Sequence, residues 1–227
     1  MISPFLIEKY LQKLVAPHPT PKDFRDAIVV ASKQAREDVV RLWLKEGIPF
    51  SFRSCPAVYE RIRFWLGQRL GVCPKEITVV GSARIGFSMM GGEGFGRIFS
   101  QSSDLDLAIV SEQLFESMAE TFERWKEDYM NKVVSPRNPT EQHYWTENLK
   151  FSGKNIGLGF IDANKLPALN RYPLAQRVNH TIWALRARLE STTSIPVPKK
   201  ASLRVYRSWR ALVERVSFNL LTAMVRS

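Results

Sequence analysis

Short apolar runs in an otherwise helical chain limit the possible folds more than any other feature of the sequence. Residues Glu76–Val80 form a β-branched run that ends in Gly81-Ser82, a pattern typical of a buried strand that leads into a tight turn. A second run, Leu105–Val110, follows a turn-forming pair of serines, and a third, Ile156–Ile161, ends at Asp162. The sequence therefore predicts an α+β fold built on a small mixed β-sheet.

Apolar residues at helical spacing predict helices on both sides of these strands. The expected helices span Lys22–Glu46, Pro56 to the stop at Gly71, Glu112–Asn131, Leu169–Leu189 and Ala201–Val225. The polar, proline-containing stretch Ser135–Asn148 is predicted to be a loop. We expect three parts: N-terminal helices in residues 1–72, a core in residues 73–165 and a basic helical module in residues 166–227.

The composition is that of a globular chain with a core. The 227 residues suffice for one elaborated domain or two small ones, and 44% of them are hydrophobic and 24% charged. No apolar run approaches the roughly 18 residues that a membrane span needs, and polar residues interrupt the first fifteen positions. We therefore expect an unprocessed cytoplasmic protein with no membrane partner. The two cysteines are too few for a disulfide scaffold.

The net charge of +11 is concentrated in the C-terminal third of the chain. From Ala163 onwards there are twelve lysines and arginines against two acidic residues, which leaves 21 basic and 20 acidic residues for the rest. This concentration favours a polyanionic partner such as nucleic acid, although an anionic membrane, an acidic protein or a merely solubilising surface stays open. The candidate nucleic-acid contacts are Arg177, Arg186, Lys199, Lys200, Arg204, Arg207 and Arg210.

Two aspartates at the start of the second strand are the candidate catalytic residues. Side chains alternate along a strand, so Asp104 and Asp106 point to the same face with Cα atoms roughly 6–7 Å apart. Two such carboxylates can share a pair of Mg²⁺ ions, as in two-metal phosphoryl transfer. Gly81 lets the backbone approach a phosphate, Ser82 supplies a hydroxyl and an amide, and Arg84 is placed to add a phosphate contact.

These residues resemble a known family. The segment VVGSARIGFS followed by SSDLDLAIV is similar to the DNA polymerase β-like nucleotidyltransferase superfamily, whose signature is a strand-terminal Gly-Ser followed by Asp-x-Asp on the next strand. The resemblance implies that Asp104 and Asp106 bind two Mg²⁺ ions and that Ser82 contacts the triphosphate. It also implies a third carboxylate on a later strand, which helps to hold metal and to activate the acceptor. Asp162 is our candidate for this third position, and Glu147 is a weaker one.

The chain departs from the compact members of that superfamily between the two motifs. Residues Ala83–Ser103 separate Ser82 from Asp104, and this spacing of 21 residues is about twice that of the compact members. The excess residues are Met89–Phe99, and the four glycines among them suggest a mobile flap over the nucleotide with Arg97 in reach of phosphate. Alternatively, the insertion blocks the pocket and leaves the fold without activity.

The resemblance implies a magnesium-dependent enzyme that moves a nucleoside monophosphate from a nucleoside triphosphate, such as ATP, to an acceptor hydroxyl. The basic C-terminal third makes an RNA end, such as that of a tRNA, the first choice of acceptor. One alternative is a degenerate fold that only binds RNA or nucleotide, for example within a toxin–antitoxin or defence assembly. Another is transfer to a protein side chain or synthesis of an oligonucleotide. No feature of the sequence identifies a protein partner.

Overall fold

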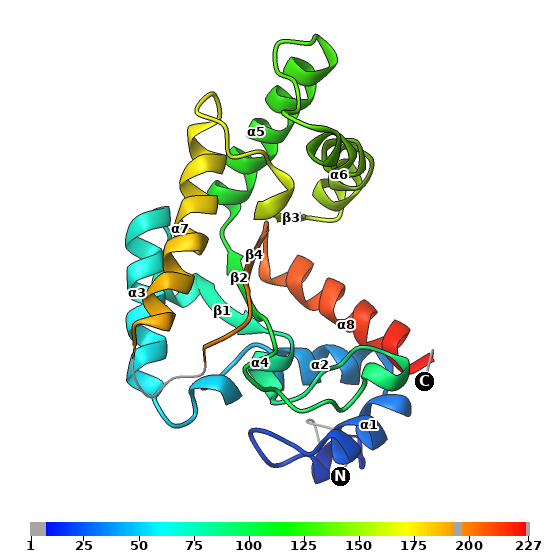
Figure 1. Ribbon diagram of the computed structural model, residues 1–227. Coiled ribbons are helices and arrows are strands. Elements are labelled where there is room, and N and C mark those ends of the chain that lie inside the picture. Colours follow the sequence, from blue (N-terminus) through cyan, green and yellow to red (C-terminus); the bar gives the residue numbers. More distant parts are fainter. Residues whose placement is uncertain (1–7, 193–196, 226–227) are drawn as a thin grey trace.

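A computed structural model describes residues 8–192 and 197–225 of the chain. Within these ranges the protein has an α+β fold in which helices surround one small sheet (Figure 1). The strands are β1 (Ile77–Val80), β2 (Leu105–Val110), β3 (Phe160–Asp162) and β4 (Ala201–Tyr206). The helices are α1 (Pro21–Val29), α2 (Lys33–Trp43), α3 (Pro56–Leu70), α4 (Ser82–Ile85), α5 (Glu112–Met130), α6 (Pro139–Gly157), α7 (Pro173–Glu190) and α8 (Trp209–Val225). None of the described helices is both long enough and apolar enough for a membrane crossing.

The four strands form a mixed sheet in the order β1-β2-β4-β3. Strand β1 runs antiparallel to β2, β2 runs parallel to β4, and β3 runs antiparallel to β4. In this register Asp106 lies opposite Val80 on one side and Ser202 on the other, while Arg204 lies opposite Asp162. The strand order thus brings the middle and the end of the chain together at the centre of the sheet.

Two cores form, one on each face of the sheet. Leu107 and Ile109 of β2 belong to the core that α3, α5 and α7 complete, whereas Ala108 and Val110 belong to the core with α1, α2 and α8. Figure 1 shows α3 and α7 side by side on one side of the sheet and α8 on the other. Alternate residues of β2 therefore face different helices, as the period of a strand requires.

Strand β4 corrects the prediction for the C-terminal third of the chain. We expected one helix over Ala201–Val225, but residues 201–206 form a strand and only residues from Trp209 onwards are helical. Leu203 and Val205 face one core while Tyr206 faces the other, and this alternation of period two is the signature of a strand. The sheet crosses the expected boundary at residue 166, so residues 166–227 do not form a separate helical module.

Other helices begin and end at signals that the sequence contains. The predicted helix Lys22–Glu46 is two helices, α1 and α2. Ser32 is the N-cap of α2, and its side chain accepts a hydrogen bond from the amide of Ala35 (3.1 Å). The predicted loop Ser135–Asn148 is wrong from Pro139 onwards, where α6 begins. Asn138 caps that helix, because its side chain accepts a hydrogen bond from the amide of Glu141 (2.9 Å). The polar composition of the segment reflects an exposed helix face.

Replacing Val205 tests whether β4 holds the sheet together. This side chain is completely buried in the core with α3, α5 and α7. We expect Val205→Asp to lower the free energy of unfolding by more than about 4 kcal/mol, because it places an unpaired carboxylate in an apolar core. Urea unfolding followed by circular dichroism measures the effect.

The matched control is Arg207→Ala, one residue beyond the strand. The Arg207 side chain is 45% exposed and pairs with Glu116 at 2.9 Å, so its loss should cost less than about 1 kcal/mol. A chain shortened to residues 1–199 should show no cooperative transition at all. If the shortened chain instead unfolds cooperatively, the C-terminal third is a separate module, as the sequence predicted.

Candidate functional site

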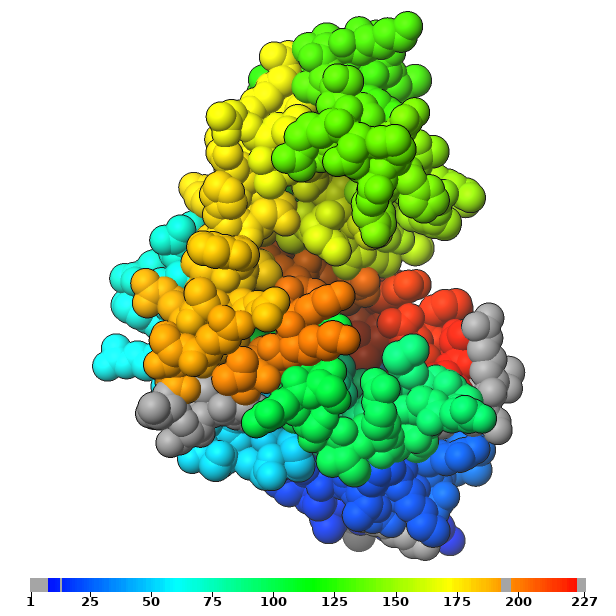
Figure 2. Space-filling model, in the orientation of Figure 1, coloured from blue at the N-terminus to red at the C-terminus, as the bar shows by residue number. Residues whose placement is uncertain are grey.

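A cleft of about 1070 Å³ opens at the end of the sheet where β1 finishes and β2 and β4 begin. Figure 2 shows a hollow between the green segment that follows β1, the orange residues that lead into β4 and the red helix α8. Nine of the predicted site residues line this cleft: Gly81, Ser82, Arg97, Asp104, Asp106, Asp162, Lys199, Lys200 and Arg204. The strand order therefore gathers residues that are more than a hundred positions apart in the sequence.

Asp106 is a half-buried carboxylate of the cleft. The hydroxyl of Ser202, its neighbour on β4, donates to Asp106 Oδ1 at 2.6 Å. Burial raises the pKa of the Asp106 carboxyl, and the nearby Asp104 and Asp162 act in the same direction, while Ser202 and Arg204 oppose them. Its negative charge is thus only partly compensated by the protein, and a bound cation would complete the compensation. Asp104 lies exposed at the rim.

Gly81 lies directly against this carboxylate. Its backbone has φ +69° and ψ −152°, a region that glycine alone adopts readily. A Cβ atom at this position would stand 3.0 Å from Asp106 Oδ2. Ser82 follows as the first residue of the single-turn helix α4 and is half-buried in the cleft wall. The Gly-Ser turn and the Asp106 carboxylate are therefore in contact.

Asp162 lies in the same cleft but has a partner of its own. The Arg204 Nε atom donates to Asp162 Oδ1 at 2.7 Å, and the register of β3 and β4 places these two residues opposite each other. Over the described residues, no three carboxylate, histidine or cysteine side chains gather closely enough to hold one metal ion together. Asp162 is therefore not assembled with Asp104 and Asp106 into the expected group of three. The weaker candidate, Glu147, lies on α6 outside the cleft.

The remaining two carboxylates fit Mg²⁺. This ion is usually held by one or two carboxylates and completes its octahedron with water and substrate phosphates. Asp104 directly precedes β2 and Asp106 lies on it, both line an open cleft, and the charge of Asp106 is under-compensated. The donor set supports a metal that is shared with a phosphate ligand, rather than a closed site made of protein groups alone.

Arg84 does not reach the cleft, which corrects its predicted role in phosphate binding. The side chain is only 3% exposed and donates to the carbonyl oxygens of Trp43 (3.1 Å, from Nε) and Gly47 (2.7 Å, from Nη1). The turn of α4 directs it into the interior, where it fastens the segment after α2 to the sheet. Burial lowers the pKa of this guanidinium from its usual value.

The glycine-rich insertion forms a wall of the cleft. Its two arms pair as a short hairpin, in which the amides of Ser88 and Gly96 donate to the carbonyls of Arg97 (2.8 Å) and Ser88 (2.9 Å). At its tip, Gly91 packs so closely on α8 that a Cβ atom would stand 2.7 Å from the Ala223 carbonyl oxygen. The insertion thus lines the cleft without filling it, and Gly91 lets its tip pack closely on α8.

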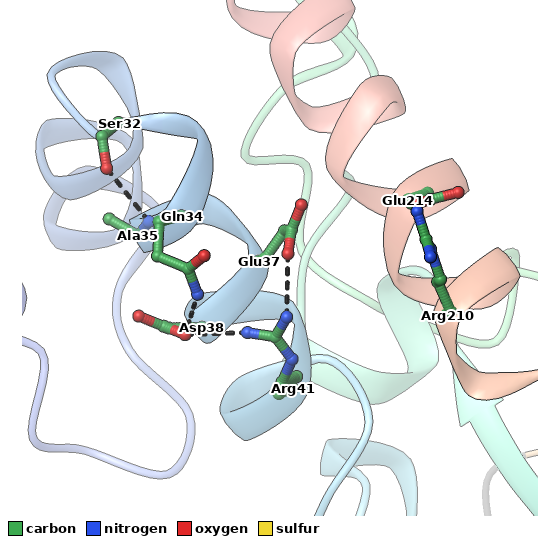
Figure 3. A network of polar contacts seen from close by, with 8 residues as sticks. All are labelled: Ser32, Gln34, Ala35, Glu37, Asp38, Arg41, Arg210 and Glu214. Atoms are coloured by element: carbon green, nitrogen blue, oxygen red, sulfur yellow. Dashed lines mark hydrogen bonds and ion pairs between the residues drawn. The ribbon is translucent and has the colours of Figure 1, made fainter.

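The basic residues predicted to bind nucleic acid fall into two groups. Lys199, Lys200 and Arg204 line the cleft, whereas Arg177, Arg186, Arg207 and Arg210 lie outside it. Three of the outer group form ion pairs: Arg186 with Glu190, Arg207 with Glu116 and Arg210 with Glu214. Figure 3 shows the last pair on α8, beside the charged face of α2. The outer residues therefore do not extend the cleft.

Sequence reasoning missed two residues of the site, Ser202 and Arg215. Ser202 belongs to the strand that was predicted as helix, so its place opposite Asp106 could not be foreseen. Arg215 lines the cleft from α8. Comparison of the chain with protein-family models, curated proteins and solved structures gives no match, so the family resemblance rests on the residues themselves.

Gly81→Ala tests the contact between the two motifs. The added methyl group meets Asp106 Oδ2, and the backbone is in a region that costs a non-glycine residue about 1–3 kcal/mol. We expect a loss of stability of this size in urea unfolding, together with weaker nucleotide binding in a titration.

Gly71→Ala is the matched control for Gly81→Ala. Gly71 also has a positive φ of +71°, but nothing lies within 4 Å of its added Cβ. We expect it to lose about 1 kcal/mol of stability and to bind nucleotide as the wild type does. Equal nucleotide binding by both variants would contradict a functional role for the Gly81–Asp106 contact.

Arg84→Met tests the structural role that replaces the predicted one. Loss of the guanidinium leaves the carbonyl groups of Trp43 and Gly47 without the donor that the buried arginine supplies, so we expect the free energy of unfolding to fall by about 1–3 kcal/mol. The control is Arg53→Met, because exposed Arg53 also donates to a carbonyl, that of Phe50, at 2.9 Å. Its loss should cost less than about 1 kcal/mol. If Arg84→Met unfolds at the same urea concentration as the wild type, the structural role of Arg84 is contradicted.

Proposed function

We propose that this protein is a Mg²⁺-dependent nucleotidyltransferase that moves a nucleoside monophosphate from a nucleoside triphosphate to an acceptor hydroxyl. The observation that carries this proposal is the contact between the Gly81-Ser82 turn and the Asp106 carboxylate in one open cleft. A turn suited to phosphate beside two carboxylates suited to Mg²⁺ is what transfer at the α-phosphorus requires. The volume of about 1070 Å³ leaves room for a triphosphate together with part of an acceptor.

Each residue of the cleft has a distinct part in this proposal. The Ser82 hydroxyl donates to a phosphate oxygen, and Gly81 allows that phosphate to approach the backbone. Asp104 and Asp106 would hold Mg²⁺, which, when bound, neutralises charge on the reacting phosphate and on the leaving pyrophosphate. The Ser202 hydroxyl keeps the Asp106 carboxylate in one orientation through the bond at 2.6 Å. The acceptor oxygen bonds to the α-phosphorus as the bond from that phosphorus to the pyrophosphate breaks, and the proton of the acceptor hydroxyl passes to water in the open cleft.

The acceptor in this proposal is an RNA end. Arg97, Lys199 and Lys200 are exposed side chains of the cleft wall, and the backbone of Lys199 is fixed beside the catalytic strand because its amide donates to the Ser103 carbonyl (3.0 Å). Cations at the rim of a phosphate cleft favour a strand whose backbone carries further phosphates. The arginines outside the cleft have no part in this proposal.

A binding module without turnover is the second candidate, and the Asp162–Arg204 ion pair favours it. In the family that the motifs resemble, a third carboxylate helps to hold metal and to activate the acceptor, whereas here Asp162 is engaged by Arg204 at 2.7 Å. A protein of this kind would hold nucleotide or RNA in the same cleft and would release it unchanged.

Replacing Asp106 separates these two candidates. The protein is incubated with Mg²⁺, each α-labelled nucleoside triphosphate in turn and a pool of small RNAs. We expect label in RNA with the wild type and a decrease of at least about a hundredfold with Asp106→Asn, because a carboxylate that holds metal is lost while the side-chain shape is kept. Asp26→Asn, an exposed residue paired with Lys22, is the control and should keep full activity.

The other outcomes distinguish the remaining hypotheses. Label on the protein, or in a new small product, would support nucleotidyl transfer but would contradict RNA as the acceptor. No transfer by the wild type, combined with nucleotide or RNA binding that survives Asp106→Asn, would make the binding module the better proposal.

A further inference from the structure

Two arginines in the cleft stack on one aromatic ring, that of Phe160. The guanidinium carbons of Arg204 and Arg215 lie 4.7 and 4.9 Å from the ring centre of Phe160. Arg204 comes from β4 and Arg215 from α8, and both line the cleft. Stacking on an aromatic face holds a guanidinium in place and leaves its N–H groups at the edge free to bind.

The charges around this arginine pair are not balanced by the protein. Asp162 compensates Arg204, but no described residue forms an ion pair with Arg215, and its buried Nε atom has no hydrogen-bond partner among them. Two neighbouring cations with one carboxylate between them leave a net positive site. Across the whole cleft, five basic side chains (Arg97, Lys199, Lys200, Arg204, Arg215) face three acidic ones (Asp104, Asp106, Asp162).

Asp162 has a structural task at this site. Its carboxylate accepts from Arg204 Nε, which is one of the five N–H groups of the side chain, and the Phe160 ring restrains the guanidinium. An arginine restrained in this way is pre-organised for an anion and loses little freedom when one binds. Asp162 is then a positioning residue for Arg204 and not a ligand of the metal.

We infer that Arg204 and Arg215 form a phosphate-binding site that works without metal, in the part of the cleft beside Phe160 and Asp162. The ligand is a chain of phosphate groups, and the triphosphate of a nucleotide fits best because one end can lie on the arginines while the other reaches Ser82. The identity of this ligand rests on the proposed function, whereas the anion site itself does not.

The test measures the binding of sodium tripolyphosphate by calorimetry in EDTA at low salt. We expect the wild type to bind, and Arg204→Met and Arg215→Met each to weaken binding by about tenfold or more, because each removes a charged donor. The matched control is Arg210→Met on α8, since Arg210 is 86% exposed, pairs with Glu214 and lies outside the cleft. Circular dichroism verifies that each variant is folded, and Arg204→Lys should bind with intermediate affinity.

Asp162→Asn tests the positioning role in the same assay. Removal of a negative charge by itself strengthens the binding of an anion, whereas loss of the Arg204 anchor weakens it, so the two effects have opposite signs. We expect weaker binding, and tighter binding would overturn the positioning role. In EDTA, Asp106→Asn should not weaken binding, because the site needs no metal.

A second arm replaces tripolyphosphate with a short oligoadenylate that carries a 5′-hydroxyl. If Arg204→Met weakens only the binding of this RNA, the site holds the phosphates of an acceptor strand and the triphosphate assignment is overturned. If wild-type protein binds neither ligand in EDTA, or if Arg210→Met weakens binding as much as Arg204→Met, the anion site itself is overturned. These results do not depend on turnover, so they are separate from failure of the transfer assay.

Discussion

The parallel pairing of β2 with β4 is the interaction on which the rest of the structure depends. It joins Leu105–Val110 to Ala201–Tyr206 over six consecutive residue pairs, and it closes a connection of 90 residues that contains α5, α6 and α7. Parallel strands need a crossover of at least about a dozen residues, and the helices of the crossover pack back on the sheet. Here α5 and α7 do so, and the ends of β2 and β4 then form the cleft.

The electrostatics of the cleft follow from this pairing. One face of β2 and β4 carries Asp106, Ser202 and Arg204, none of which a sheet covered with helices would normally bury. Each is stabilised by a neighbour across the sheet: Asp106 by the Ser202 hydroxyl and Arg204 by the Asp162 carboxylate. The compensation is incomplete at Asp106 and at Arg215, and these are the two places where a metal ion and a phosphate would complete it.

The walls of the cleft are built by close backbone packing. Gly81 places the first turn after β1 against the Asp106 carboxylate, and Gly91 seats the inserted hairpin on α8. Larger residues at either position would separate these walls from the floor, because a Cβ atom would stand 3.0 Å or less from its neighbour. The inserted hairpin between Ser82 and Asp104 thus shapes the cleft together with α8, which belongs to the other end of the chain.

The sequence by itself determined the α+β class, the strands β1 and β2 and the core of the candidate site, because Gly81-Ser82 and Asp104-x-Asp106 are local patterns on neighbouring strands. Such local patterns can be predicted from the sequence because side-chain alternation and turn conformation depend on a few neighbouring residues. Only the tertiary structure decided that residues 201–206 are a strand, that Arg84 points inward and that Asp162 pairs with Arg204. Each of these depends on a partner far away in the sequence, and no local periodicity encodes which distant backbone or charge will be adjacent.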